Sequence, residues 1–148
     1  MSFTVKTEGF NGELSLLGEN AFEDIAKKAL NDIRADVESI TKSAVRASVK
    51  HSGESELVNS VRTYNPTMTR DNYGAKLHCG FSGRSSSGNR YNNNGRDHAV
   101  YNNDKAFWLE YGTVKQAARP WRDRASNNID ARVTPKMEQT LFKELGVE

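Results

Sequence analysis

Cys79 beside His78 is the residue pair whose types could support nucleophilic catalysis, because an imidazole can activate a neighbouring thiol. Neighbours on a strand point to opposite faces, however, and the stretch 75–81 alternates apolar and polar residues as a half-buried strand does. Cys79 shares the parity of the apolar residues Leu77 and Phe81. We therefore expect a buried structural thiol that lies apart from the imidazole.

Asp97 and His98, followed by Asn102 and Asn103, have the residue types of a ββα-metal nuclease, which needs a histidine base, a metal ligand and a supporting asparagine. The rest of that pattern is missing from the sequence. None of the three histidines has a histidine at i+4 or a cysteine pair nearby, so the spacing predicts no metal site. The sequence also lacks phosphate-loop, nucleophile-elbow and dinucleotide motifs. We expect a protein that is not an enzyme and that binds no metal or cofactor.

Basic residues gather in two stretches, although 21 basic and 19 acidic residues give a net charge of only +2. Arg84, Arg90 and Arg96 lie among serines, glycines and asparagines in 82–104, and a second group follows in 115–124. The composition of 82–104 is typical of a long mobile loop. Three readings stay open for it: a solvated linker, a finger that contacts DNA, or an arm that becomes ordered on a partner.

The chain of 148 residues is short enough for one domain, but only 36% of it is apolar and its mean hydropathy is −0.76. Its core is therefore small or shared between subunits. One cysteine cannot form an internal disulfide, and the first ten residues lack the apolar segment of a signal peptide. We expect a reducing, intracellular place of folding and no membrane span.

The elements that must position these residues follow from periodicity. Apolar residues at three- and four-residue steps predict a long amphipathic helix that begins at Glu19 and ends near Ser52. A second helix is predicted over 123–145, where Pro135 kinks or divides it. The strand over 75–81 belongs to an antiparallel sheet, 57–61 is a helical turn or the start of a strand, and 105–111 is a strand or a short helix. Residues 1–18 form a short strand or an arm.

These elements predict an α+β fold, in which a long N-terminal helix packs on a small antiparallel sheet beside a C-terminal helix and a long flexible loop. We expect an N-terminal arm over 1–18 and a single domain over 19–148 with the mobile loop at 82–104.

The stretch 106–125 combines aromatic residues with a turn and a second start. Apolar area is supplied by Phe107, Trp108, Leu109 and Tyr111. Gly112 permits a sharp turn, and Pro120 opens the next segment before Trp121. The carboxylate of Glu110 either faces solvent or pairs with a cation. An exposed position on a strand and an ion pair between subunits both remain open for it.

In order and content, these motifs resemble those of the head–tail joining proteins of long-tailed bacteriophages, a neck or tail-completion family. The resemblance covers roughly residue 21 to the C-terminus. It rests on three blocks: Gly53, Leu57, Ser60 and Val61; Tyr101 with 108–113; and Pro120, Trp121 and Ala125.

The resemblance implies a virion protein of the neck, assembled in the bacterial cytoplasm, whose copies form a ring that joins head to tail and lets DNA pass. A hexamer is the first expectation and a dodecamer the second. The implied partners are head-side connector or portal proteins, tail-tube or terminator proteins, and double-stranded DNA held without sequence preference.

For this ring we expect one group of residues at the packing interface and another at the lumen or on a partner. The first group is Trp108, Glu110, Tyr111, Gly112, Thr113, Pro120 and Trp121, and the second is Arg84, Arg90, Arg96 and Arg119. The alternative function is a small nucleic-acid-binding protein that uses the arginine- and asparagine-rich segment directly.

Overall fold

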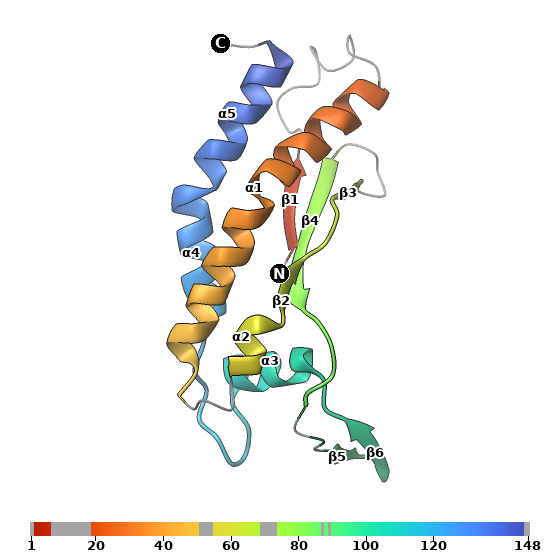
Figure 1. Ribbon diagram of the computed structural model, residues 1–148, viewed down its shortest axis with the longest axis vertical. Coiled ribbons are helices and arrows are strands. Elements are labelled where there is room, and N and C mark those ends of the chain that lie inside the picture. The colour runs from red at the N-terminus through yellow and green to blue at the C-terminus, as the bar shows by residue number, and fades with distance from the viewer. Residues whose placement is uncertain are drawn as a thin grey trace. The chain divides into compact units, whose positions relative to one another are not determined.

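The computed structural model describes residues 2–6, 19–50, 55–68, 74–86, 88 and 90–146. Its fold is α+β, as the sequence predicts (Figure 1). The elements in chain order are β1 (Ser2–Lys6), α1 (Glu19–Ser48), α2 (Ser55–Asn59), β2 (Val61–Thr63), β3 (Thr67–Met68), β4 (Gly74–Phe81), β5 (Arg90–Asn93), β6 (Arg96–Ala99), α3 (Asn102–Tyr111), α4 (Arg122–Arg132) and α5 (Thr134–Leu145).

The residues fall into two compact units that alternate along the chain. Unit 1 consists of Met1–Val37, Thr63–Cys79 and Asn128–Glu148, and unit 2 of Glu38–Arg62 and Gly80–Asn127. We expected a single domain over 19–148 and did not predict this division into two units. It has no local signal in the sequence, because α1, β2, β4 and α4 each contribute residues to both units.

Helix α1 confirms the predicted amphipathic pattern. Its apolar residues recur at steps of three and four, and those in unit 1 that are buried are Phe22, Ala26, Ala29, Leu30, Ile33 and Val37. Most of the charged residues lie on the remaining faces, where Lys27 pairs with Glu23 one turn away. Burial of one stripe therefore stabilises the 30-residue helix.

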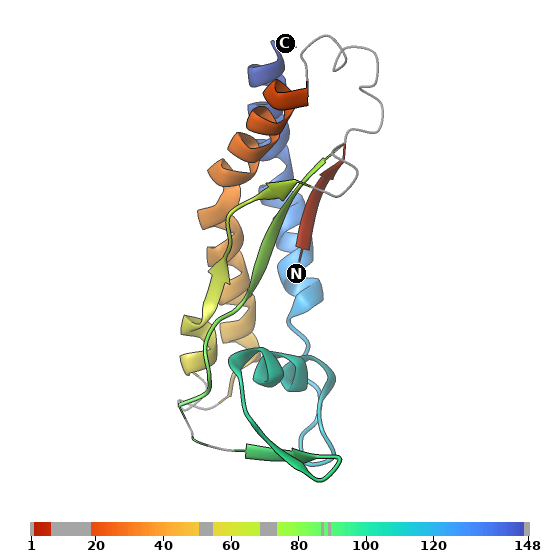
Figure 2. The ribbon, with the colours of Figure 1, turned by 90° about the vertical axis from the view of Figure 1, so that its right-hand side faces the viewer.

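Strand β4 is the centre of the sheet. Residues Gly74 to His78 pair with β1 in antiparallel register, and β3 pairs with β4 at Lys76 and Ala75 (Figure 2). Ala75, Leu77 and Cys79 are buried while Lys76 and His78 are exposed, which confirms the predicted alternation. Of residues 1–18, expected as an arm or a strand, Ser2–Lys6 form β1; residues 7–18 lie outside the described part of the chain.

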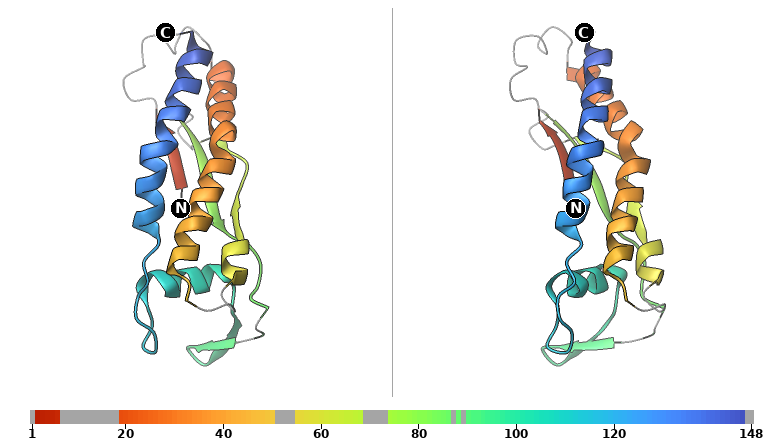
Figure 3. Two further views of the ribbon diagram at one scale, coloured as in Figure 1. Left: turned by 60° about the vertical axis from the view of Figure 1, so that its left-hand side comes forward. Right: turned by 90° about the vertical axis from the view of Figure 1, so that its left-hand side faces the viewer.

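Helix α5 lies beside the first half of α1 in unit 1 (Figure 3). Lys28 pairs with Glu144 at 2.6 Å, and Asp36 pairs with Lys136 at 2.6 Å, so the two helices run in opposite directions. The bond to the Glu144 carboxylate raises the pKa of Lys28. Pro135 stands in the first turn of α5 and separates it from α4 at Val133, so the proline divides the predicted C-terminal helix.

Within 82–104, where we expected a mobile loop, unit 2 contains the β5–β6 hairpin and the start of α3. Asn94 and Gly95 form its two-residue turn with φ of +53° and +77°, the geometry in which Asn-Gly is favoured. At the stem of the hairpin, where its two strands join the rest of unit 2, Ser85 N–H donates to the Val100 carbonyl and Asn102 N–H donates to that of Gly83. The polar composition hid this hairpin because none of the strand residues whose burial is described, 90–92 and 96–99, is buried.

Candidate interface on helix α3 and the β5–β6 hairpin

Helix α3 carries apolar residues on opposite faces. Asn102, Ala106 and Leu109 are buried, whereas Phe107 and Tyr111 are 60% and 56% exposed. The rings of these two exposed residues lie one helical turn apart, with centroids separated by 4.7 Å. Val114, in the turn that follows, is fully exposed. We call Phe107, Tyr111 and Val114 the outer stripe.

Trp121 is the anchor at the junction of α3 and α4. Its side chain is only 4% exposed, its indole N–H donates to the Ala106 carbonyl at 3.2 Å, and its ring meets Phe81 edge to face at 5.2 Å. A buried indole with its one donor bonded makes a large contribution to stability. The expected packing role of Trp121 is thus explained by contacts within one chain.

Glu110 caps the start of α4. Its carboxylate oxygen accepts hydrogen bonds from the backbone N–H groups of Trp121 at 2.8 Å and Arg122 at 3.1 Å. The first N–H groups of a helix have no partner inside the helix, and a carboxylate satisfies them while it offsets the positive end of the helix dipole. Neither an exposed position nor an ion pair between subunits describes this intramolecular role.

Gly112 sets the direction of the chain after α3. It has φ of +78°, and a Cβ atom there would lie 2.7 Å from the backbone nitrogen of Ala118. Thr113 N–H donates to the Gln116 carbonyl, and Arg119 N–H donates to that of Leu109, so the loop folds back on α3. Thr113 and Pro120 are both exposed.

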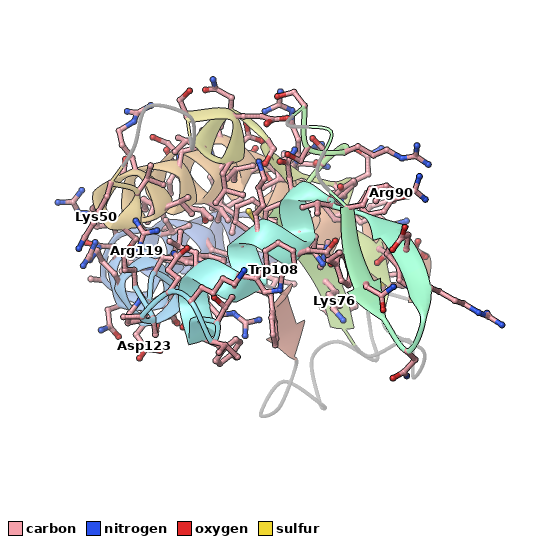
Figure 4. The ribbon with its side chains drawn as sticks, turned by 90° about the horizontal axis from the view of Figure 1, so that it is seen from below. Lys50, Lys76, Arg90, Trp108, Arg119 and Asp123 are labelled. Carbon is pink, nitrogen blue, oxygen red and sulfur yellow. The ribbon has the colours of Figure 1, made fainter. Side chains whose placement is uncertain are left out.

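Aromatic rings attach the hairpin to α3. The ring of Tyr91 meets that of Trp108 edge to face at 5.5 Å and stacks on His98 at 5.5 Å. At the stem of the hairpin, the guanidinium of Arg84 lies 5.5 Å from the centre of the Tyr101 ring. Trp108 is therefore the point where the hairpin contacts the helix (Figure 4).

The four arginines expected at a lumen or partner occupy two settings. Arg84, Arg90 and Arg96 are exposed on the hairpin and its stem, and Figure 4 shows Arg90 there. Arg119 is half-buried near Lys50, where its guanidinium donates to the Ser48 carbonyl at 3.1 Å. That bond satisfies a carbonyl at the end of α1, so Arg119 also has a structural role.

Glu56 on α2 connects the hairpin stem to α3. Its carboxylate accepts bonds from the Ser86 N–H at 2.8 Å and the Ser86 hydroxyl at 2.9 Å, and Lys105 lies 3.6 Å away. The backbone hydrogen bond from Ser86 is the main cause that lowers the pKa of Glu56. This bond could not be predicted from the sequence, because a carboxylate in a short segment has many possible partners.

The two residue sets considered for catalysis do not assemble. Cys79 is buried, whereas His78 is exposed and its ring lies against Tyr64; partial desolvation lowers the pKa of His78. Asp97 and His98 line a cavity of about 580 Å³ next to the hairpin. Asn102 does not join them there, because its side-chain amide donates to the Ser82 carbonyl.

Neither a metal-binding cluster nor a membrane-spanning helix is present among the described residues. No group of three or more histidine, cysteine, aspartate or glutamate side chains is placed to hold a metal ion there. Among the same residues, no helix is both long and apolar enough to cross a membrane.

Sequence reasoning missed Glu56 and Val114, and it counted Phe107 among the residues that bury apolar area rather than as an exposed ring. The signal for Phe107 was present, because a helix over 105–111 places it one turn before Tyr111. A strand over the same residues would have put both rings on one face with Leu109, and the sequence left the choice between helix and strand open.

Comparison with known proteins adds no relative: no family model matches the chain, and neither a curated protein nor a solved structure matches it.

Proposed function

We propose that this chain is a structural protein of the head–tail junction of a long-tailed bacteriophage, where copies form a ring through which DNA passes. The resemblance to the neck or tail-completion family supplies the proposal. A hexamer is the first expectation for the ring and a dodecamer the second, with connector or portal proteins on the head side and tail-tube or terminator proteins on the other.

The observation that carries this proposal is the outer stripe on α3. Tyr111 lies inside the block 108–113 of the resemblance, Phe107 and Val114 lie directly on either side of it, and together they expose two aromatic rings and a valine in a chain with few apolar residues. Exposed aromatic residues are enriched at protein interfaces because they bury much area with little loss of side-chain entropy. A partner surface at this motif is what an assembly protein requires.

The other motif residues support the same function by making the stripe rigid. Trp121, Glu110 and Gly112 fix the path from α3 to α4 through bonds inside one chain. A surface held in place before binding loses less entropy on association. Some residues of the motif thus fix the position of α3, and others are free to contact a partner.

The test is to locate the protein in purified particles by electron microscopy. Particles that carry a small tag at the C-terminus of this chain should show the label at the neck in a ring of copies. A matched preparation of untagged particles provides the control. A label on the capsid shell or tail fibres, or no label on the particle, would overturn the proposal.

A second function, a small nucleic-acid-binding protein, is favoured by one observation. Unit 2 contains 12 of the 21 basic residues but 7 of the 19 acidic ones, and it includes the exposed Arg90 and Arg96. Duplex DNA titrated at several salt concentrations separates the two functions. Tight binding by the isolated chain, with a steep salt dependence that Arg90→Ser and Arg96→Ser reduce, favours the second.

A further inference from the structure

We propose that the cavity next to the β5–β6 hairpin binds one nucleotide with an unpaired base, whose phosphate lies on arginines and whose base lies against aromatic rings. This binding goes beyond the proposed function and does not depend on the ring, because every lining residue belongs to unit 2 of one chain. Its support comes from the size of the cavity, from the donors and acceptors in its lining, and from the rings beside them.

The cavity has the size of a site for one small molecule. Its volume is about 580 Å³, and pockets of about 300 to 1,000 Å³ hold small ligands and cofactors. Two lining residues, Ser85 and Val100, are buried and joined by a backbone hydrogen bond of 2.9 Å, so part of the wall is formed before a ligand binds. A base inside a double helix must leave its stack to enter a pocket. The cavity therefore fits a single nucleotide rather than duplex DNA.

Two arginines of the lining have hydrogen-bond donors to spare. Arg84 lies over the ring of Tyr101, and its guanidinium forms no hydrogen bond or ion pair with another described residue. Arg90, exposed on the hairpin (Figure 4), donates to the Asp97 carbonyl at 3.3 Å. A guanidinium has five N–H donors in a planar fork that matches the oxygens of a phosphate. The two side chains can therefore bind a phosphate without giving up a strong internal bond.

Aromatic rings form the second part of the lining. Tyr101 is 44% exposed, and an isolated antiparallel bridge pairs it with Arg84, which places the two side chains on one side of the chain. Across β5 and β6, the ring of His98 is stacked on that of Tyr91 at 5.5 Å, and Tyr91 in turn contacts Trp108 on α3. Unpaired bases stack on aromatic side chains in many proteins that bind single strands. Rings and arginines thus line one cavity, as a base and its phosphate require.

Two carboxylates in the lining distinguish a nucleotide from a simple anion. Asp97 Oδ1 accepts a hydrogen bond from the side-chain amide of Asn92. Asp104 Oδ2 accepts one from the Tyr101 N–H. The other oxygen of each carboxylate has no donor among the described residues. Free phosphate would be repelled by these carboxylates, whereas the amino group of cytosine can donate to one of them. The mixed lining therefore fits a ligand that carries both a phosphate and a base.

Two sources of such a nucleotide share this chemistry. One is a free nucleoside monophosphate, and the other is an unpaired nucleotide in a DNA strand. Both present a phosphate beside a base whose faces and edges are uncovered. The experiments use dCMP for the first source and a short deoxycytidine strand with a terminal phosphate for the second.

The first experiment titrates the full chain with dCMP, up to about 20 mM, and follows the backbone amides by NMR. We expect the amides of Ser85, Ala99 and Tyr101 in the lining to shift with a dissociation constant of about 1 mM or below, while that of Gly112 stays in place. Inorganic phosphate and deoxycytidine should each bind at least about tenfold more weakly, because each lacks one half of the ligand.

Two results of this titration would overturn the proposal. One is the absence of saturable shifts in the lining. The other is an affinity for inorganic phosphate that equals the affinity for dCMP, because the cavity would then be a site for any small anion.

Arginine variants test whether the cavity itself binds the nucleotide. Arg90→Ser should raise the dissociation constant of dCMP about tenfold, because it removes donors to the phosphate. Arg96→Ser is the matched control, since Arg96 is exposed on the same hairpin but does not line the cavity, and it should change the constant less than about twofold at about 150 mM salt. Both positions are exposed, so the serines leave the fold intact. Equal effects of the two variants would indicate general charge attraction and overturn the site.

The second experiment separates the two sources by competition. A deoxycytidine strand that shifts the same amides and displaces dCMP assigns the cavity to an unpaired nucleotide of DNA, and binding of dCMP without the strand assigns it to a free nucleotide. A blunt duplex should not displace dCMP, because its bases are paired and stacked. Displacement of dCMP by the blunt duplex would overturn the requirement for an unpaired base.

Discussion

The α3–α4 junction and the β5–β6 hairpin are both parts of unit 2, yet they are held in opposite ways. At the junction a buried indole, a capping carboxylate and a glycine in a crowded turn determine one conformation. The hairpin buries none of the strand residues 90–92 and 96–99, and it depends on its Asn-Gly turn and on the ring contact between Tyr91 and Trp108. The most conspicuous motif residues therefore stabilise the chain, while the surfaces open to partners carry weaker signals in the sequence.

The largest expected difference in stability between the two regions comes from replacing their tryptophans. Trp121→Ala should lower the free energy of unfolding by about 4 kcal/mol, because it removes a buried ring and leaves the Ala106 carbonyl without its indole donor. Trp108→Ala is the matched variant and should cost about half as much, since Trp108 is only half-buried. Urea denaturation of the two variants measures the difference. Equal losses would show that the hairpin contact is as important for stability as the junction.

Two glycines with positive φ give the next largest effect. A Cβ at Gly112 would meet backbone atoms of the returning loop, whereas one at Gly95 in the hairpin turn would meet nothing within 4 Å. We expect Gly112→Ala to cost about 3 kcal/mol and Gly95→Ala about 1 kcal/mol, because only the first adds crowding to backbone strain. Thermal and urea unfolding compare the two variants. A similar cost at both positions would assign the requirement at Gly112 to its φ alone.

Periodicity predicted the elements that bury residues. Helix α1, strand β4 and the break near Pro135 all follow from apolar spacing or from the missing N–H of proline. The burial of Cys79 and the exposure of His78 follow from the alternation along β4. These features depend on neighbours close in sequence, which is why a single sequence is enough to predict them.

The rest depends on contacts between distant residues. The bond from Trp121 N–H to Glu110 spans a turn whose path is set by Gly112, and the bond from Ser86 to Glu56 spans 30 residues. The hairpin was missed for a different reason: strand residues 90–92 and 96–99 are not buried, so their pattern looks like that of a loop. The outer stripe could have been predicted only after a helix was chosen over a strand for 105–111.

A smaller effect is expected from the cap at the junction. Glu110→Gln keeps an oxygen acceptor but removes the charge that faces the start of α4, so it should cost about 1 kcal/mol in the free energy of unfolding. Glu138→Gln, at an exposed position on α5, is the matched control and should change stability by less than about 0.5 kcal/mol. Urea denaturation at neutral pH measures both. A null result at Glu110 would mean that Trp121 alone fixes the junction.

The smallest effect is expected at the stem of the hairpin, where the Glu56 carboxylate binds Ser86. Because this bond lowers the pKa of Glu56 below its usual 4.5, the folded chain holds the carboxylate ionised in a range where the unfolded chain takes up a proton. Its stabilising contribution is complete above pH 4.5 and is lost as the pH falls through the lower folded value. The Ser86 amide resonance, followed by NMR through an acid titration, should therefore move with a midpoint below 4.5.

In Glu56→Gln that titration should disappear, while the Gly112 amide, which donates to Trp108 in the junction, should not respond to the change. A Ser86 amide that titrates equally in the variant would show that another carboxylate controls the stem. Because Glu56 is only partly buried, protonation should loosen the segment around Ser86 without unfolding the junction. Acid would then separate the two regions that the tryptophan variants compare, since it removes a contact of the hairpin stem in which neither Trp121 nor Glu110 takes part.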